Sequence, residues 1–368
     1  MSAEACDDGM SLKPGAVITG NKGGYTIVKL LGEGGFGAVY RVQFTEKDGS
    51  VSEYAMKVEK KMEKRKHSKL KMEVAILKLV CEERKTGSHF TDIIDRGKKE
   101  HYFFLVMTLV GPSLDDMKRQ RPHKVFSLAT GLGAGLQCLE AVEDLHKHGF
   151  IHRDLKPANY ARGLGIQRRI VYLLDFGIAR RYLNDNEELK TPRSAVPFKG
   201  TVRFASRNCH RNKEMGPKDD CESWFYLLLD LIVPVGLPWK KMAERDDVLK
   251  CKDEIREDSE KRNNTFFYRI PCKDYLTKML QYIDSRGYTD KVDYEFLYDG
   301  IKATASKSGV KLDAPYDWEV EGSNSATGKS GSKTNFSSIK STKSSLKKAP
   351  TKTLKSKFTQ SKTTSNTK

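Results

Sequence analysis

The residues of this 368-residue chain that could do chemistry gather in two short segments, 152–159 and 175–177. In the first, Asp154 could orient a hydroxyl group and accept its proton, and Lys156 could offset negative charge on a moving group. Asn159 and Asp175 offer the hard oxygen atoms that Mg²⁺ prefers. Any one of these residues alone could cap a helix or shape a turn. Together, their types and order indicate phosphoryl transfer.

A glycine-rich segment, Gly32-Glu-Gly-Gly-Phe-Gly37, precedes these residues. Its spacing also occurs in dinucleotide-binding turns, but those are followed by a helix and by an acidic residue about 20 positions on. Here a strand-like run follows, and the residue 20 positions beyond Gly37 is Lys57. A glycine loop between two strands can fold over a triphosphate, with its backbone N–H groups facing phosphate oxygens. Taken alone, the segment could also be an ordinary glycine-rich hairpin.

Lys57 ends a predicted strand, and a predicted helix over 68–80 supplies a partner for it. The apolar stripe of that helix contains one carboxylate, in the set Leu70, Glu73, Val74, Leu77 and Val80. Because a buried charge must be paired, we predict an ion pair between Lys57 and Glu73. Such a pair would hold the lysine ammonium against α- and β-phosphate oxygens. Glu59 lies off the stripe and is expected to be solvated.

The elements that must position these residues change in character along the chain. Runs rich in Val, Tyr, Phe and Leu predict strands over 25–31, 38–44, 53–58 and 102–108. After about Pro112 the spacing becomes helical, as in Leu128, Leu132, Leu136, Leu139, Val142 and Leu145. The same helix contains Gly131, Gly133 and Gly135, each of which costs about 1 kcal/mol relative to alanine unless close helix packing requires it. The expected fold class is α+β, with a small β-rich lobe followed by a larger α-helical lobe.

Charge and composition divide the chain into three predicted regions: a polar N-terminal extension (1–24), a folded domain (25–320) and a tail (321–368). The formal net charge is +18, of which +10 belongs to the 48-residue tail. Ser and Thr make up 21 of those 48 residues, and the apolar residues among them are isolated. Such a segment cannot bury enough apolar surface to offset the entropy of ordering. The tail is therefore expected to be flexible.

Several protein classes are disfavoured. The most apolar stretch, 224–235, contains Asp230 and Pro234 and is shorter than the roughly 20 residues of a membrane span. No apolar signal-peptide core occurs near the N-terminus. Seven scattered cysteines without a C-x-x-C pair argue against a disulfide framework or a zinc site. We expect a cytoplasmic, or alternatively nuclear, location with no transmembrane segment.

These motifs resemble the protein kinase superfamily over residues 25 to about 310. The lysine two positions after Asp154 resembles the serine/threonine kinases. Finer similarity is to the casein kinase 1 group, especially its tau-tubulin kinase branch. It is carried by 109–114, by 200–208 (where most kinases have Ala-Pro-Glu), by 212–216 and by Asp219-Asp220. Ala158 and Tyr160 depart from the family pattern, but neither would carry charge in the reaction.

The resemblance implies a bilobal protein kinase fold, with an N-lobe over 25–110 and a C-lobe over 111–320. It implies ATP and Mg²⁺ as cofactors and Ser/Thr hydroxyls of proteins as acceptors. Catalytic roles would belong to Asp154, Lys156, Lys57 and Glu73, and metal binding to Asn159 and Asp175. Asp220 would brace the catalytic loop. The nucleotide would contact Leu31, Gly32, Gly34, Gly37, Val39, Lys57, Met107, Thr108 and Val110.

A basic segment over 180–218 is expected to favour acidic or already phosphorylated substrates. The resemblance points to Arg203 and Lys240 as the anion site, and a solvated basic surface is the alternative.

A pseudokinase scaffold is a second hypothesis for the function of the whole chain, but every charged residue of the reaction is present. A third reading is a binding protein that acts through its basic tail. That tail could contact anionic partners, serve as a substrate or stay solvated, and the protein is expected to be monomeric.

Overall fold

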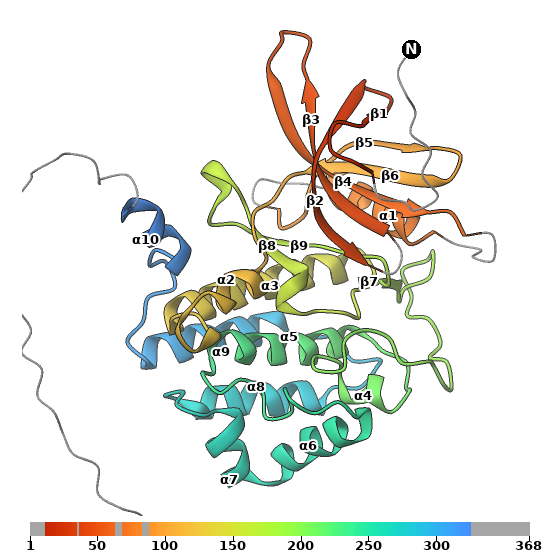
Figure 1. Ribbon diagram of the computed structural model, residues 1–368. Helices are drawn as coiled ribbons and strands as arrows, with labels where there is room; N and C mark the ends of the chain where they lie inside the picture. Colours follow the sequence, from red (N-terminus) through yellow and green to blue (C-terminus); the bar gives the residue numbers. More distant parts are fainter. Residues whose placement is uncertain (1–11, 35–36, 63–67, 83–87, 325–368) are drawn as a thin grey trace, which may run out of the picture. The chain divides into compact units, whose positions relative to one another are not determined.

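The computed structural model describes residues 12–34, 37–62, 68–82 and 88–324. The chain divides into a compact unit, 1–326, and a separate segment, 327–368, which lies outside the described residues. The compact unit contains a sheet-rich lobe and a helical lobe, drawn in red to orange and in yellow to blue in Figure 1. This is the predicted bilobal α+β architecture.

An antiparallel sheet with strand order β1-β2-β3-β4-β6-β5 forms the first lobe. The predicted strands and helix of this lobe are all present, and β1 and β5 are additional. The elements are β1 (Val17–Thr19), β2 (Gly24–Gly34), β3 (Gly37–Thr45), β4 (Val51–Lys60), α1 (Lys69–Glu82), β5 (Ile93–Lys98) and β6 (Tyr102–Thr108).

The start of the chain differs from the loose extension expected over 1–24. Residues 17–19 pair with β2, and Ile18 is buried beneath the sheet while Val17 is exposed. One inward side chain in a three-residue strand is too little pattern to recognise in a polar stretch. Residues 1–11 lie outside the described part. At the other end, α10 (Asp317–Asn324) continues past the expected boundary at 320.

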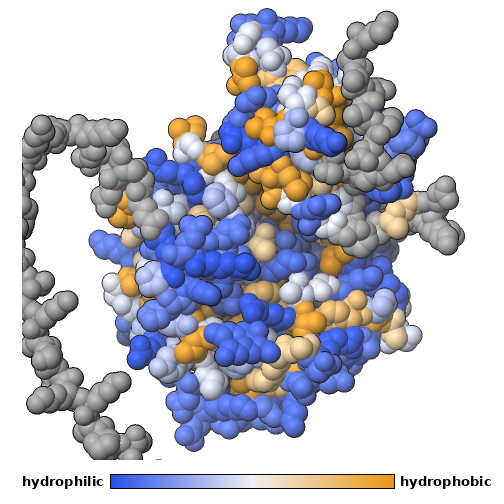
Figure 2. Space-filling model, in the orientation of Figure 1, coloured by the Kyte–Doolittle hydropathy of each residue, from blue (hydrophilic) through white to orange (hydrophobic). Residues whose placement is uncertain are grey.

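The second lobe is mainly helical. Its longer helices are α2 (Leu114–Arg119), α3 (Leu128–Lys147), α5 (Pro217–Ile232), α6 (Arg245–Glu257), α8 (Lys273–Ser285) and α9 (Tyr294–Lys307). Shorter elements are β7 (Phe150–Ile151), β8 (Tyr160–Arg162), β9 (Val171–Leu173), β10 (Arg180–Arg181), α4 (Arg207–His210) and α7 (Ser259–Lys261). Short 3₁₀ or π segments occupy Pro122–Lys124, Pro157–Asn159, Gly165–Gln167 and Arg262–Phe266. On the face shown in Figure 2 hydrophilic residues predominate, and apolar residues form small separate groups.

Helices α3 and α5 pack closely against each other in this lobe, and two glycines of α3 make that approach possible. A Cβ atom at Gly131 would lie 2.1 Å from Cγ2 of Ile232, and one at Gly135 would lie 2.4 Å from Cδ1 of Leu228. Both distances are far below van der Waals contact, so close packing does account for these glycines. The segment Pro122–Lys147, which includes α3, is long and apolar enough to span a membrane, but twelve residues of α3 are buried in this core.

We predict that Gly131→Ala lowers the free energy of unfolding by about 1–2 kcal/mol. Overpacking a core typically costs about 1–3 kcal/mol, and the better helix propensity of alanine recovers at most about 1 kcal/mol. Urea unfolding followed by circular dichroism measures the difference. Gly287→Ala is the control, because the nearest atom to its new Cβ would be Oδ2 of Asp290 at 3.5 Å. Equal destabilisation by the two changes would contradict the packing argument.

Candidate active site

Lys57 lies between two carboxylates that come from distant parts of the chain. Its Nζ atom is 2.6 Å from Oε2 of Glu73 on α1 and 3.0 Å from Oδ1 of Asp175, which follows β9. The predicted ion pair with Glu73 is therefore present. Burial alone would lower the pKa of Lys57, but the two carboxylates outweigh it and raise that pKa. The ammonium group stays charged at neutral pH.

Asp175 is ionised as well. Burial alone would raise the pKa of its carboxyl group, but the neighbouring Lys57 ammonium lowers it to about 2. The carboxylate is also partly exposed, with a side-chain exposure of 54%. A charged, accessible oxygen pair of this kind suits a divalent cation. Asp175 has a φ of 65°, a conformation that costs free energy in a non-glycine residue and is common at functional sites.

Glu59 corrects one sequence-based expectation, because it is buried rather than solvated. Its carboxylate accepts hydrogen bonds from Oγ of Ser68 (2.6 Å) and from the backbone N–H groups of Lys69 (3.0 Å) and Leu70 (2.6 Å). It thus satisfies the free N–H groups at the start of α1, where a negative charge also favours the helix dipole. Since Glu59 lies two residues after Lys57 on β4, this contact helps to set the position of Glu73.

The Asp154 carboxylate accepts hydrogen bonds at both of its oxygens. Oδ1 accepts from the Thr201 hydroxyl at 2.7 Å, and Oδ2 accepts from Nζ of Lys156 at 2.7 Å. Lys156 also donates to Oγ1 of Thr201 at 3.0 Å, which closes the triangle. Sequence reasoning did not find Thr201, although it lies in the unusual 200–208 motif. The three side chains hold the carboxylate in one orientation beside a positive charge.

Asn159 joins this triangle to the region of Asp175. Its side-chain nitrogen donates to the backbone carbonyl of Asp154 at 2.8 Å, and the backbone carbonyl of Asn159 accepts from the Leu174 amide at 2.8 Å. With the nitrogen engaged, the side-chain oxygen is the atom that can serve as a metal ligand. Asp154, Asn159 and Asp175 thus converge at one site, as the motif order predicted.

Asp220, near the start of α5, braces the loop that carries Asp154. Its carboxylate accepts from the backbone N–H groups of His152 (2.5 Å) and Arg153 (2.9 Å) and contacts Nε2 of His146 (3.0 Å). Burial alone would raise the pKa of this carboxyl group, but these contacts lower it. The predicted bracing role is confirmed by these hydrogen bonds.

The glycine segment joins two strands, β2 and β3, which excludes the strand-to-helix dinucleotide turn. Gly34 pairs with Gly37 at the end of the ladder, and residues 35–36 lie outside the described part. A Cβ at Gly37 would lie 1.9 Å from the Val58 carbonyl oxygen, so glycine is required there. A Cβ at Gly32 or Gly34 would have no neighbour within 4 Å. That open side leaves room for a bulky group against the backbone.

The remaining predicted nucleotide contacts lie on the same lobe. Leu31 is half exposed, and Val39 pairs with Lys57 across β3 and β4. Met107 is buried at the end of β6, while Thr108 and Val110 are only partly buried. Apolar side chains, open glycines and a charged lysine together fit a nucleotide triphosphate. The described residues contain no cluster of three or more His, Cys, Asp or Glu side chains that could hold a metal.

The two predicted anion-site residues, Arg203 and Lys240, lie next to each other and are joined by a side-chain to backbone hydrogen bond. The Arg203 guanidinium donates to the backbone carbonyl of Lys240 at 3.1 Å and lies 3.8 Å from the carboxylate of Asp230. The Lys240 ammonium bonds instead to the Val235 carbonyl. Arg203 is 38% exposed and remains accessible to an anion.

Comparison with known proteins matches residues 25–290 to the protein kinase domain. The chain belongs to the protein kinase family. A probable serine/threonine-protein kinase of Dictyostelium discoideum is 33% identical over 308 residues, covering 83% of this chain and 58% of that protein. The serine/threonine-protein kinase spe-6 of Caenorhabditis elegans is 32% identical over 298 residues, covering 80% and 75%. The chain spans little more than half the length of the Dictyostelium relative.

The chain is accordingly an ATP-dependent protein kinase of the serine/threonine class. The sheet-rich lobe and the helical lobe are the two lobes of the kinase fold. The active site lies where Lys57 of the sheet-rich lobe contacts Asp175 of the helical lobe. The other residues at this place are Asp154, Lys156 and Asn159.

Proposed function

We propose that this kinase transfers the γ-phosphoryl group of ATP to Ser and Thr hydroxyls with the residues described above. One observation supports the assignment most: the Asp154 carboxylate is held by Lys156 and Thr201 in the same site as Asn159 and the Lys57–Asp175 pair. Asp154 would orient the acceptor hydroxyl and take its proton, and Lys156 would offset charge on the transferred group.

The nucleotide side would be held by the sheet lobe. Lys57, kept charged by Glu73, would grip the α- and β-phosphate oxygens while the backbone of 32–37 covers the phosphates. Asp175 and the side-chain oxygen of Asn159 would bind Mg²⁺, whose chemistry is to neutralise charge that develops on the phosphate oxygens. The ionised state of Asp175 at neutral pH supports this part of the proposal.

We assign the kinase to the casein kinase 1 group, near its tau-tubulin kinase branch, on the motifs at 200–208 and 212–216. Within the first motif, Thr201 contacts Asp154 and Arg203 lies at the surface. Substrate identity does not follow from this assignment, because target choice depends on surfaces outside these motifs.

We further propose that substrates carrying an acidic or phosphorylated residue near the acceptor are preferred, with Arg203 as the main contact. A peptide with phosphoserine upstream of the acceptor should show a higher kcat/KM than its alanine counterpart. Arg203→Ala should lower the kcat/KM for the phosphoserine peptide about tenfold or more, since a charge-assisted hydrogen bond contributes about 1.5–3 kcal/mol and about 1.4 kcal/mol corresponds to a tenfold change. Arg269→Ala, an exposed arginine elsewhere on the helical lobe, is the control. Equal use of both peptides by the parental kinase would remove the proposal.

The tail and the cellular setting are proposals from the sequence alone. A cytoplasmic, or alternatively nuclear, location agrees with the scattered cysteines, and a monomeric state is proposed beside it. The eleven lysines of 321–368 would attract an anionic partner.

A further inference from the structure

The segment between Thr201 and Ala205 is held in shape by side chains from outside it. The Thr201 carbonyl accepts from the amides of Phe204 and Ala205, both at 2.9 Å, which forms a tight turn. The Arg203 carbonyl accepts from Nε1 of Trp239 at 2.7 Å. The two other carbonyls for which a partner is described, at positions 202 and 205, bind a single lysine on α6, Lys252.

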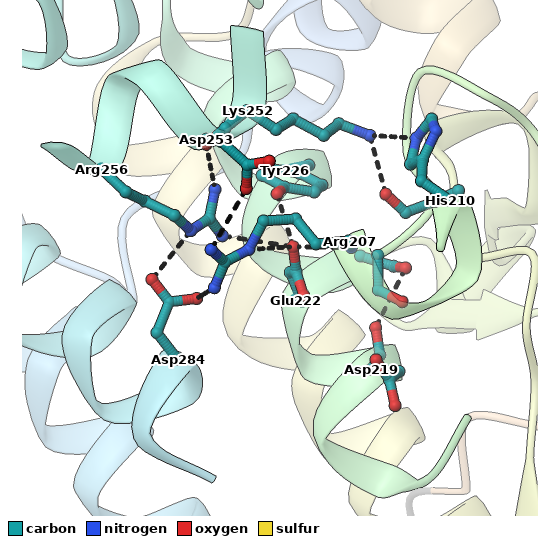
Figure 3. Close-up of polar contacts among 12 residues, drawn as sticks. Arg207, His210, Asp219, Glu222, Tyr226, Lys252, Asp253, Arg256 and Asp284 are labelled. Carbon is teal, nitrogen blue, oxygen red and sulfur yellow. Dashed lines mark hydrogen bonds and ion pairs between the residues drawn. The ribbon is translucent and has the colours of Figure 1, made fainter. Parts of the chain in front are cut away.

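Lys252 is fully buried, and each donor of its ammonium group has a partner. Nζ donates to the carbonyls of Val202 (3.1 Å) and Ala205 (2.7 Å) and contacts Nε2 of His210 at 3.1 Å. Figure 3 shows the side chain extending away from α6 to reach His210. The ammonium also lies over the rings of Tyr226 (4.8 Å) and Trp239 (5.1 Å), which is a favourable arrangement for a desolvated cation.

The helix that presents Lys252 is itself firmly anchored. One turn later, Arg256 forms ion pairs with Glu222 on α5 (3.2 Å) and Asp284 on α8 (2.8 Å). Arg207, at the start of α4, binds the same Asp284 at 2.7 Å, and Figure 3 shows both arginines converging on these carboxylates. Lys252 therefore extends from a fixed support toward a segment that has little regular structure of its own.

We propose that Lys252 is a positioning residue whose ammonium group holds the backbone of 201–205, and with it the Thr201 hydroxyl, in the place that phosphoryl transfer requires. The inference rests on the role proposed above for Asp154, which Thr201 contacts. Lys252 itself touches neither the reacting atoms nor the nucleotide site.

The surroundings make this contact sensitive to pH. Burial lowers the pKa of Lys252 to about 7, and burial together with the Lys252 charge lowers that of His210 to about 4. His210 is thus neutral and can accept a hydrogen bond. Above pH 7 the neutral amine keeps two N–H donors for three acceptors, so the contact weakens as the pH rises. The titratable and charged groups that face Lys252 from α4, α5 and α6 are Cys209, His210, Glu222, Tyr226, Cys251 and Arg256.

The test compares Lys252→Met with the parental kinase on a neutral peptide between pH 6 and 9. At pH 6.5 we expect kcat to fall about ten- to a hundredfold, the range that a small misplacement of catalytic groups can cost. ATP affinity, measured with a fluorescent nucleotide, should not change. The parental kcat should decline above about pH 7, and this decline should be missing in the variant. Lys307→Met, at an exposed position on α9, is the matched control.

Lys252→Arg gives a second test, because its guanidinium stays charged over the whole range. It should recover part of the lost kcat and remove the decline above pH 7. A merely structural role would lower the melting temperature of Lys252→Met and leave its kcat and pH profile unchanged, and that result would overturn the proposal. If Asp154→Asn kept parental activity, the function proposed above would fail instead, so the two failures can be told apart.

Discussion

Asp154→Asn is expected to abolish most turnover while leaving the fold and nucleotide affinity intact. Loss of one preorganised electrostatic contact typically costs about 10²–10³ in rate, and this change also removes the group that would accept the proton. The new amide can still accept from Thr201. However, it would place an N–H₂ group where the Lys156 ammonium now donates. A steady-state assay of kcat with a peptide substrate measures the loss.

Asp299→Asn is the matched control, because Asp299 is an exposed aspartate on α9 that pairs only with exposed Lys302 among its described ion pairs. It should keep parental kcat. Circular dichroism and ATP binding would establish that Asp154→Asn is folded. A folded Asp154→Asn with near-parental kcat would show that another group orients the hydroxyl.

Lys57→Met is expected to reduce kcat/KM for ATP by a similar factor, through a different part of the reaction. The ammonium would be lost from between Glu73 and Asp175, so the phosphates would lose their cation. Buried Glu73 would also be left without its partner, which destabilises the charged carboxylate. Nucleotide affinity and peptide turnover, measured together, show whether binding, chemistry or both are affected.

Lys60→Met provides the comparison, since Lys60 is an exposed lysine three residues along the same strand. Parental values are expected for it. If Lys57→Met bound ATP and turned over peptide as the parental chain does, the ion pair would be a structural feature only.

The parts of the site that could be predicted share one property: their evidence lies within a single segment or a single helical stripe. Glu73 stands out because its carboxylate interrupts an apolar helical stripe. The catalytic loop and the aspartate after it stand out because the side chains that phosphoryl transfer needs follow one another in order, as Asp154, Lys156, Asn159 and Asp175. Glu59 and Thr201 gave no such signal. Glu59 contacts the start of α1 only because β4 packs against that helix. Thr201 contacts Asp154 only because two loops pack together.

Backbone contacts were the least visible from the sequence. The three glycines of α3 show a cost in helix propensity, but the reason for it lies in side chains far along the chain. Gly131 and Gly135 face Ile232 and Leu228 of α5, and Gly133 faces Tyr316. Lys252 reads as an ordinary charged residue on an amphipathic helix. Its burial and its hydrogen bonds to two carbonyls become evident only when α6 is placed against the loop before α4.

A crystal structure with a non-hydrolysable ATP analogue and Mn²⁺ tests the convergence of these residues most directly. Anomalous scattering locates the metal without reference to the protein. The account predicts Mn²⁺ bound by the Asp175 carboxylate and the Asn159 side-chain oxygen, with Lys57 on the phosphates and Asp154 facing the terminal phosphate. Metal and triphosphate bound away from these four side chains would contradict it.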